Sequence, residues 1–298
     1  MKQYLSPKEL AQAVGVSESS LKRWADDGRI RGYRTAGGHR RIDITEAVRF
    51  IRDSAMPVRD PQALGLPDVS GPIGVGADDP ASPAMLRSAL EAGEGDKVRA
   101  MLVSMYLGGQ TVGELFDGPV ADAMHALGEL WRDRADGIMI EHRATDLCLG
   151  AIAQLRALLP PADDAAPVAL GGAFSGDPYL LPSLMAATVL ASEGFREMNL
   201  GPDTPAPVLV DAAQRAGARL VWVSVSVASS MDAVTDALAA LVDGLTDREL
   251  SIVIGGRGLP QPLGLKRPNL HIASSMSELA AFARGLNAAH GTPRRRQA

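Results

Sequence analysis

A segment rich in proline and glycine divides the chain into two parts of different composition. Residues 54–84 contain six prolines and four glycines and show no apolar periodicity. This composition is typical of an extended or flexible linker. The expected linker covers residues 56–83 and separates a head, residues 1–55, from a longer body.

Charge is distributed unequally between these parts. Of the 30 Lys or Arg and 35 Asp or Glu in the chain, residues 1–60 hold twelve and eight, so the head is basic and the remainder acidic. This asymmetry predicts that only the head meets a polyanion such as double-stranded DNA. The basic end of the chain, residues 291–298, is expected to be a disordered tail.

Composition also excludes several classes of protein. No run reaches the roughly 18 apolar residues that a membrane span needs, and the N-terminal residues lack the apolar core of a signal peptide. We therefore expect a cytoplasmic protein with no membrane partner. The one cysteine, Cys148, excludes an intrachain disulfide and a cysteine-rich zinc site, and no metal site is expected.

The head has the pattern of a helix-turn-helix. Ser6, with Pro7 next to it and Glu9 three residues on, predicts a capped first helix. Gly15 permits a turn, and Ser17 can cap a second helix. The outward positions of the second helix have the chemistry of a recognition helix in a major groove, and they are Ser19, Ser20, Lys22 and Arg23.

A basic wing is predicted to follow. Gly37 and Gly38 separate two short extended runs and indicate the tip of a β-hairpin. Clamping of DNA phosphates is the simplest use for the side chains around this tip, which are Arg34, His39, Arg40 and Arg41. The alternative is a small helical domain with a solvated basic loop, but helix pattern, wing and charge together favour DNA binding.

The block from Tyr4 to Arg52, particularly LSPKELA, SLKRW and GGHRRI, resembles the winged helix-turn-helix of MerR-type regulators. The resemblance implies that the second helix reads bases and that the wing grips the DNA backbone. It also implies binding of two or more copies to an operator of inverted or direct repeats. Many members dimerise through a long coiled coil after the head. That pattern is absent here, so the body or the DNA must supply the contact between copies.

The body has two patterns. From 84 to 162, apolar residues recur with helical period, and breaks at Gly93, Gly108 and Asp136–Gly137 predict a four-helix bundle. From 166 to 290, short apolar runs alternate with amphipathic segments, which predicts a doubly wound, Rossmann-like parallel sheet. The expected fold class is therefore multi-domain α and α/β. Ligands of such sheets lie at the carboxyl ends of the strands, which here include the loop GGAFSGDPYLLP.

Trp131, Glu141 and His142 are expected at one end of the bundle, because Asp136 and Gly137 turn the chain between them. An indole, a carboxylate and an imidazole at one rim could cap a flat ligand. Equally, Trp131 could be a core residue, and Glu141 could be an acid favoured by the helix dipole in a first turn. The residues alone leave both interpretations open.

The segment WRDRADGIMIEH, a Trp followed after nine residues by Glu-His, resembles the helical bundle of light-sensing, cobalamin-dependent repressors of the CarH/LitR type. LGPDTP at 200–205 is similar to a loop of that family, and the order of domains is the same. The resemblance implies a bundle that covers the upper face of adenosylcobalamin, with Trp131 beside the adenosyl group.

The cobalamin signature of that family is kept only in part. Its later elements, a Ser-x-Leu-like segment and Gly-Gly, correspond to Ser224, Ser226, Gly255 and Gly256. In its first element, Asp/Glu-x-His-x-x-Gly, Asp177 keeps the acid, but Tyr179 stands where the cobalt-binding His would be and Pro182 replaces the Gly. A phenol with a pKa of about 10 is a poor ligand at neutral pH, so His-on cobalamin is not expected.

Three outcomes stay open for this loop. The protein could hold cobalamin without the axial bond, or another tetrapyrrole such as a haem with a Tyr ligand. In the third outcome Tyr179, Leu180 and Leu181 fill the pocket and leave a ligand-free dimerisation module. Loss or change of cobalamin binding is favoured over its retention.

The leading hypothesis is a DNA-binding transcriptional regulator, by resemblance a repressor, whose oligomerisation and operator binding are set by the sensor-like body. The alternatives are a true cobalamin-dependent photoreceptor repressor and a nucleotide-binding enzyme of doubly wound fold. GGAFSG and GGRG fit the G-x-G-x-x-G fingerprint poorly. No acid–base or nucleophile constellation stands out, so no enzymatic activity is expected.

Overall fold

The chain divides into two units, residues 1–160 and 161–298, which are described separately below. The computed structural model describes residues 2–66, 73, 83–227, 231–247, 249–259, 265 and 267–290. No helix within these ranges is long and apolar enough to cross a membrane.

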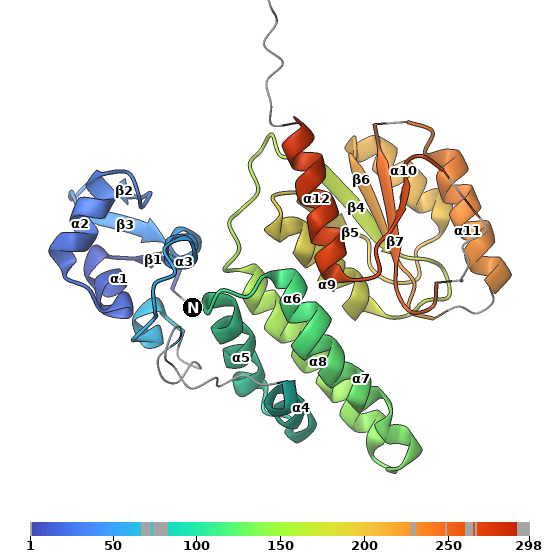
Figure 1. Ribbon diagram of the computed structural model, residues 1–298, viewed down its shortest axis with the longest axis horizontal. Helices are drawn as coiled ribbons and strands as arrows, with labels where there is room; N and C mark the ends of the chain where they lie inside the picture. Colours follow the sequence, from blue (N-terminus) through green and yellow to red (C-terminus); the bar gives the residue numbers. More distant parts are fainter. Residues whose placement is uncertain are drawn as a thin grey trace, which may run out of the picture. The chain divides into compact units, whose positions relative to one another are not determined.

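The head combines a helix-turn-helix with a small antiparallel sheet (Figure 1). Its helices are α1 (Pro7–Val14), α2 (Glu18–Asp26) and α3 (Ile44–Asp53). Its strands are β1 (Tyr4–Leu5), β2 (Tyr33–Arg34) and β3 (Arg40–Asp43), in the order β1-β3-β2. The predicted wing is the hairpin that β2 and β3 form.

The caps predicted for the first two helices are confirmed. The Ser6 hydroxyl accepts a hydrogen bond from the Glu9 N–H at 3.3 Å, and the Glu9 carboxylate accepts one from the Ser6 N–H at 2.8 Å. Gly15 ends α1 at a φ of 73°, a conformation that glycine adopts without strain. The Ser17 hydroxyl accepts from the Ser20 N–H at 3.1 Å and so begins α2.

The linker was predicted to cover residues 56–83, but residues 56–66 belong to the head. Residues 56–66 pack on the head, where two consecutive N–H groups donate to the Ala13 carbonyl and the 3-10 helix η1 (Pro61–Leu64) follows. Their fully buried side chains are Val58, Leu64 and Leu66. These apolar residues show no helical or strand period, which is why the pattern concealed their burial. Apart from Ile73, residues 67–82 lie outside the described residues, as does the predicted tail at 291–298.

The helical bundle occupies residues 83–156 (Figure 1). Its elements are α4 (Pro83–Ala92), α5 (Gly95–Leu107), α6 (Val112–Leu115), the π-helix η2 (Phe116–Val120), α7 (Ala121–Gly128), the 3-10 helix η3 (Leu130–Arg132) and α8 (Gly137–Arg156). The predicted third helix of the bundle is thus interrupted by the π turn. Pro119 lies inside that turn and cannot donate to the α-helical ladder, which accounts for the interruption.

The second unit contains the predicted parallel sheet. Its strands are β4 (Val168–Ala173), β5 (Arg196–Asn199), β6 (Leu220–Ser224), β7 (Ser251–Gly255) and β8 (Leu270–Ile272), in the order β5-β4-β6-β7-β8. The connecting helices are α9 (Leu180–Ser192), α10 (Ala206–Ala216), α11 (Met231–Gly244) and α12 (Met276–His290). The doubly wound architecture predicted from the alternation is therefore confirmed.

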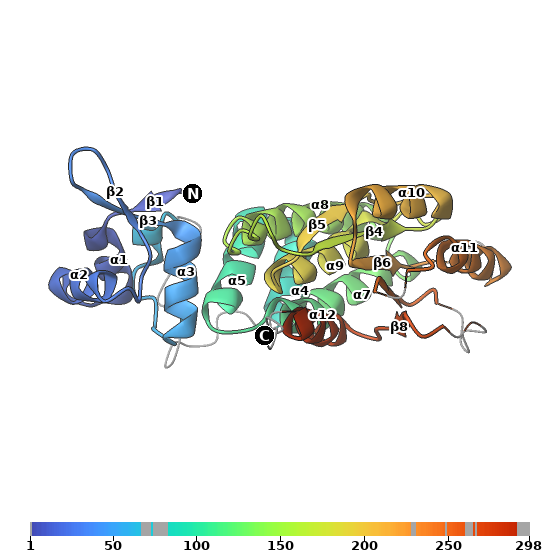
Figure 2. The same ribbon diagram turned by 90° about the horizontal axis from the view of Figure 1, so that it is seen from above.

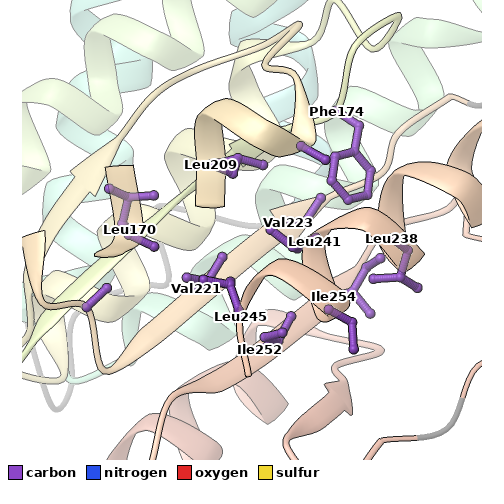
Figure 3. Close-up of a cluster of buried hydrophobic side chains, with 14 of the residues drawn as sticks. Leu170, Phe174, Leu209, Val221, Val223, Leu238, Leu241, Leu245, Ile252 and Ile254 are labelled. Atoms are coloured by element: carbon purple, nitrogen blue, oxygen red, sulfur yellow. The ribbon is translucent and has the colours of Figure 1, made fainter. Parts of the chain in front are cut away.

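Helices cover both faces of this sheet. α10 packs with α11 on one face, and α9 packs with α12 on the other (Figure 2). Between the sheet and the α10–α11 layer lies an aliphatic core (Figure 3), which includes Leu170, Leu209, Val221, Leu238 and Ile252. Full burial of each such side chain contributes about 1.5–3 kcal/mol, so this layer holds the strands in register.

The strand order creates a switch point between β4 and β6. β4 connects through α9 to β5 on one side, whereas β6 connects through α11 to β7 on the other. The loops after β4 and β6 therefore leave in opposite directions. Doubly wound sheets bind ligands in the crevice between such loops, which makes this place the first to inspect.

Gly171 of β4 lies directly beside Trp222 of the neighbouring strand β6. A Cβ at Gly171 would lie 2.2 Å from the Trp222 carbonyl oxygen and 2.3 Å from Trp222 Cδ2. We expect Gly171→Ala to lower the free energy of unfolding by about 3 kcal/mol or more, because the fully buried indole has nowhere to move.

Gly150→Ala is the matched control for that substitution. Gly150 lies on α8 with open space around its Cβ position, so alanine should raise the free energy of unfolding by about 0.5–1 kcal/mol. Urea unfolding followed by circular dichroism measures both values. Equal stability of Gly171→Ala and wild type would show that Trp222 does not pack against the strand as described.

Candidate DNA interface and strand-end crevice

The recognition helix α2 presents the predicted side chains unequally. Ser19, Lys22 and Arg23 are exposed, as expected for residues that meet DNA. Ser20 is only half-exposed, because its hydroxyl lies 2.9 Å from the Ser17 hydroxyl in the cap of α2. Ser20 therefore belongs to the helix cap as well as to the outward face.

The wing lies on the same side of the head as the exposed face of α2, because residues of both line one groove. Its tip is a tight turn in which the Thr35 N–H donates to the His39 carbonyl at 2.8 Å and Gly38 takes a φ of 78°. Between the wing, the start of α1 and α2 lies an open groove of about 480 Å³. Its lining residues are Ser6, Pro7, Lys8, Glu18, Lys22, Asp26, Arg34, Gly38, His39, Arg40 and Arg41.

Two of the predicted DNA-binding cations are paired with acids on α2. Lys22 Nζ lies 2.7 Å from Glu18 Oε1, and this contact lowers the pKa of the Glu18 carboxyl. Arg40 Nη2 lies 2.7 Å from Asp26 Oδ1. The sequence pattern missed the pairing of Arg40 with Asp26, and also Lys8, because these residues come from segments that lie apart along the chain.

Trp131 lies in η3, and the next helix, α8, carries Glu141 and His142 in its first two turns. A Cβ at Gly137 would lie 2.5 Å from the main chain of Trp131, so only glycine lets α8 begin against η3. The Trp131 side chain is 58% exposed, which excludes the alternative that it is a core residue. Glu141 Oε2 lies 3.4 Å from His142 Nε2, and the Thr145 hydroxyl donates to Glu141 Oε1 at 3.3 Å.

Two aliphatic side chains extend this rim. Ile138 and Met139 are 60% and 54% exposed in the first turn of α8, next to the Trp131 turn. The Arg132 guanidinium lies 5.6 Å from the centre of the Trp131 ring. Exposed apolar side chains beside an aromatic ring are typical of a contact surface. Ile138 and Met139 fit the apolar pattern of a buried helix face, so the sequence alone does not reveal their exposure.

Asp177 closes the crevice at the switch point of the sheet. Its carboxylate is 2% exposed and accepts from the Tyr179 N–H at 3.1 Å and from the Ser226 N–H at 2.5 Å, so it joins the loops after β4 and β6. The Asp203 N–H donates to the Asp177 carbonyl at 3.0 Å, and the Gly176 N–H donates to Asp203 Oδ1 at 2.8 Å. The Asp177 carboxylate thus joins the loops after β4 and β6, and its main-chain carbonyl together with the Asp203 carboxylate ties in the loop after β5.

The cavity left in this crevice is small. It measures about 10 Å³ and is lined by the loops after β4 and β6 and by the start of α11, room for one water at most. Within the described residues, the Ser226 hydroxyl is the buried side-chain oxygen that lacks a hydrogen-bond partner.

The glycines of the partial signature also pack against the protein itself. A Cβ at Gly255 would lie 2.5 Å from the Ala273 carbonyl oxygen, and one at Gly256 would lie 2.2 Å from the Val225 carbonyl oxygen. The Ser224 hydroxyl donates to the Gly172 carbonyl at 3.5 Å. Close approach of neighbouring main chain therefore explains these glycines without a ligand.

Tyr179 lies at the start of α9 with its side chain 46% exposed, and Leu180 is 38% exposed. Of the three outcomes left open for this loop, filling of a pocket by Tyr179 and Leu180 does not agree with the exposure of these two side chains, whereas Leu181 is buried. Tyr179 offers no nitrogen donor, and the neighbouring acid is bound to main-chain amides. These residues do not fit a cobalamin held by an axial protein bond.

Comparison with known proteins supports the two halves of this description separately. A family model described as a helix-turn-helix domain matches residues 4–53. No curated protein matches the chain.

Solved structures match the body. The monomethylamine corrinoid protein of Methanosarcina barkeri is 19% identical, with a TM-score of 0.53 over 68% of this chain and 96% of that chain. A cobalamin-binding protein of Desulfitobacterium hafniense is 17% identical, with a TM-score of 0.34 over 70% of this chain and 97% of that chain. The first likeness shows that the bundle and sheet have the fold of a corrinoid protein.

The stability that the cap of α1 contributes should depend on pH, because folding lowers the pKa of Glu9. The Lys2 ammonium, followed by the Ser6 N–H, holds the pKa of the Glu9 carboxyl at about 2, below its usual 4.5. A carboxyl whose pKa is lowered by folding stabilises the folded state above its usual pKa, and this contribution is lost as the pH falls through the lowered value. The loss should therefore occur between about pH 4.5 and pH 2.

A ¹³C NMR titration of the Glu9 carboxyl measures that pKa directly. We expect a value of about 2 in the full chain and a higher one in Lys2→Ala, which removes the largest cause of the shift. An ordinary carboxyl pKa in the wild-type chain would show that the capping contacts do not form in solution.

Proposed function

We propose that the protein is a sequence-specific DNA-binding regulator of transcription, and by its resemblance to MerR-type and CarH/LitR-type proteins a repressor. The observation that carries this proposal is the presence, in one chain, of a helix-turn-helix with a basic wing and a body with the fold of a corrinoid protein. A carrier of a corrinoid group has no use for such a head. The proposal assigns binding, and no catalytic turnover, to the body.

In this proposal α2 enters the major groove and the wing holds the DNA backbone. Ser19, Lys22 and Arg23 are exposed on α2, so they reach base edges and adjacent phosphates. Arg34, His39 and Arg41 border the groove beside the wing and neutralise phosphates there. A nine-residue recognition helix reads few base pairs, which is why specific binding requires a second head on the same operator.

The body supplies the contact between copies. Its exposed apolar rim at Trp131, Ile138 and Met139 supports a role in assembly. Because Asp177 closes the strand-end crevice and Tyr179 offers no nitrogen donor, assembly in this proposal proceeds without a bond between cobalt and the protein. Assembly controls DNA affinity. When two copies associate through their bodies, their two heads are held together, so the second head binds its half-site at a high effective concentration.

A true cobalamin-dependent photoreceptor is the second candidate. The spacing of Trp131 to Glu141 and His142, and the exposure of Trp131 and His142, favour it. The closed crevice and the replacement of the axial histidine by Tyr179 favour the first candidate. The two candidates differ in their absorption spectrum, whereas both require DNA binding by the head.

DNA selection from a random library tests the proposal. Full-length protein should enrich a motif of repeated half-sites, and Arg23→Ala should weaken binding to that motif about tenfold, as for loss of one base or phosphate contact. Arg215→Ala is the matched control, because Arg215 lies on α10 and pairs with Asp211.

Fluorescence anisotropy on the selected DNA measures both affinities. The control should bind as the wild type does. Failure to enrich any motif, or wild-type affinity in Arg23→Ala, would contradict the proposed DNA recognition.

A further inference from the structure

The recognition helix rests on a small buried base. Leu21 is the one residue of α2 that is fully buried, and Trp24 is half-buried against Phe50, with ring centres 5.6 Å apart. A nine-residue helix with so little apolar contact is poorly oriented by packing alone. Polar contacts at its two ends must therefore fix its direction, and Ser17 provides the contact at the start.

Arg40 provides the contact at the end of α2. Its Nη2 lies 2.7 Å from Asp26 Oδ1, and its Nη1 donates to the Lys22 carbonyl at 3.4 Å. Both acceptors lie in the C-terminal half of the helix, and the aligned peptide dipoles favour a positive charge near its end. One guanidinium from the wing thus holds both the carboxylate and the main chain of the recognition helix.

The register of the wing explains why Arg40 points to the helix. Successive side chains of a strand alternate between faces, so Arg40 shares a face with Ile42, which is fully buried in the head. Arg41 lies on the opposite face of β3. The Arg40 side chain is only 18% exposed, whereas a phosphate-binding side chain must extend into solvent to reach DNA.

We propose that Arg40 and Asp26 form a positioning pair that orients the recognition helix relative to the wing, and that Arg40 is not a phosphate contact. This inference rests on the proposed DNA-binding function. It assigns to Asp26, an acid on the DNA side of the head, a positive effect on DNA affinity. Simple electrostatics predicts the opposite sign, because removal of an acid near DNA phosphates should tighten binding.

Asp26→Asn and Glu18→Gln form a matched pair of variants. Each removes one negative charge from α2 by a substitution of nearly equal shape, but Glu18 pairs with Lys22 on the same helix, whereas Asp26 pairs with Arg40 of the wing. Asp26→Asn should weaken binding to the selected DNA about two- to fivefold, the range for loss of an exposed ion pair. Glu18→Gln should bind as well as the wild type or more tightly.

The salt dependence of binding separates positioning from phosphate contact. The slope of log K against log salt is negative, and loss of one phosphate contact lowers its magnitude by about 0.9. Arg41→Ala should show that decrease, whereas Arg40→Ala should weaken binding with an unchanged slope. The double variant Arg40→Ala/Asp26→Asn should be no weaker than the weaker single variant, because both remove the same contact.

Three results bear on the inference. Tighter binding of Asp26→Asn, or a slope in Arg40→Ala that falls as in Arg41→Ala, would overturn it. Weaker binding of Asp26→Asn with an unchanged melting temperature supports positioning over a general loss of stability. Absence of specific DNA binding by the wild-type protein would instead refute the proposed function, a result that does not depend on any variant.

Discussion

The buried carboxylate of Asp177 determines what the sheet domain can do. In a doubly wound sheet the crevice at the switch point is the natural ligand site, and here Asp177 closes it by accepting N–H groups from the loops after β4 and β6. A carboxylate that binds main-chain amides in this way stabilises one loop arrangement. The body therefore has the fold of a corrinoid protein, and Asp177 closes the crevice at its switch point.

The head shows how polar contacts decide function where packing is weak. Its α2 buries little apolar surface, so Ser17 at one end and Arg40 at the other fix its direction. The groove between the wing, α1 and α2 consequently contains acidic side chains as well as basic ones. DNA recognition in this account depends on the geometry of the helix and wing as much as on net positive charge, and the body contributes by bringing two such heads together.

Local patterns made much of this structure predictable. The Ser6–Glu9 cap and the alternation of strands and helices after residue 166 depend on neighbouring residues, and they were confirmed. The burial of residues 56–66, the pairing of Arg40 with Asp26 and the closure by Asp177 depend on segments far apart in the chain. Such contacts leave no period or spacing in a single sequence, so the signature residues were found but their partners were not.

The absorption spectrum of the full chain, purified with cobalamin available and run on gel filtration in darkness and after green light, tests the central claim most directly. The closed crevice predicts a colourless protein whose elution is the same in both conditions. Stoichiometric corrinoid absorption with a light-dependent change in mass would show that the crevice opens in solution. That result would contradict the account and identify the body as a light sensor.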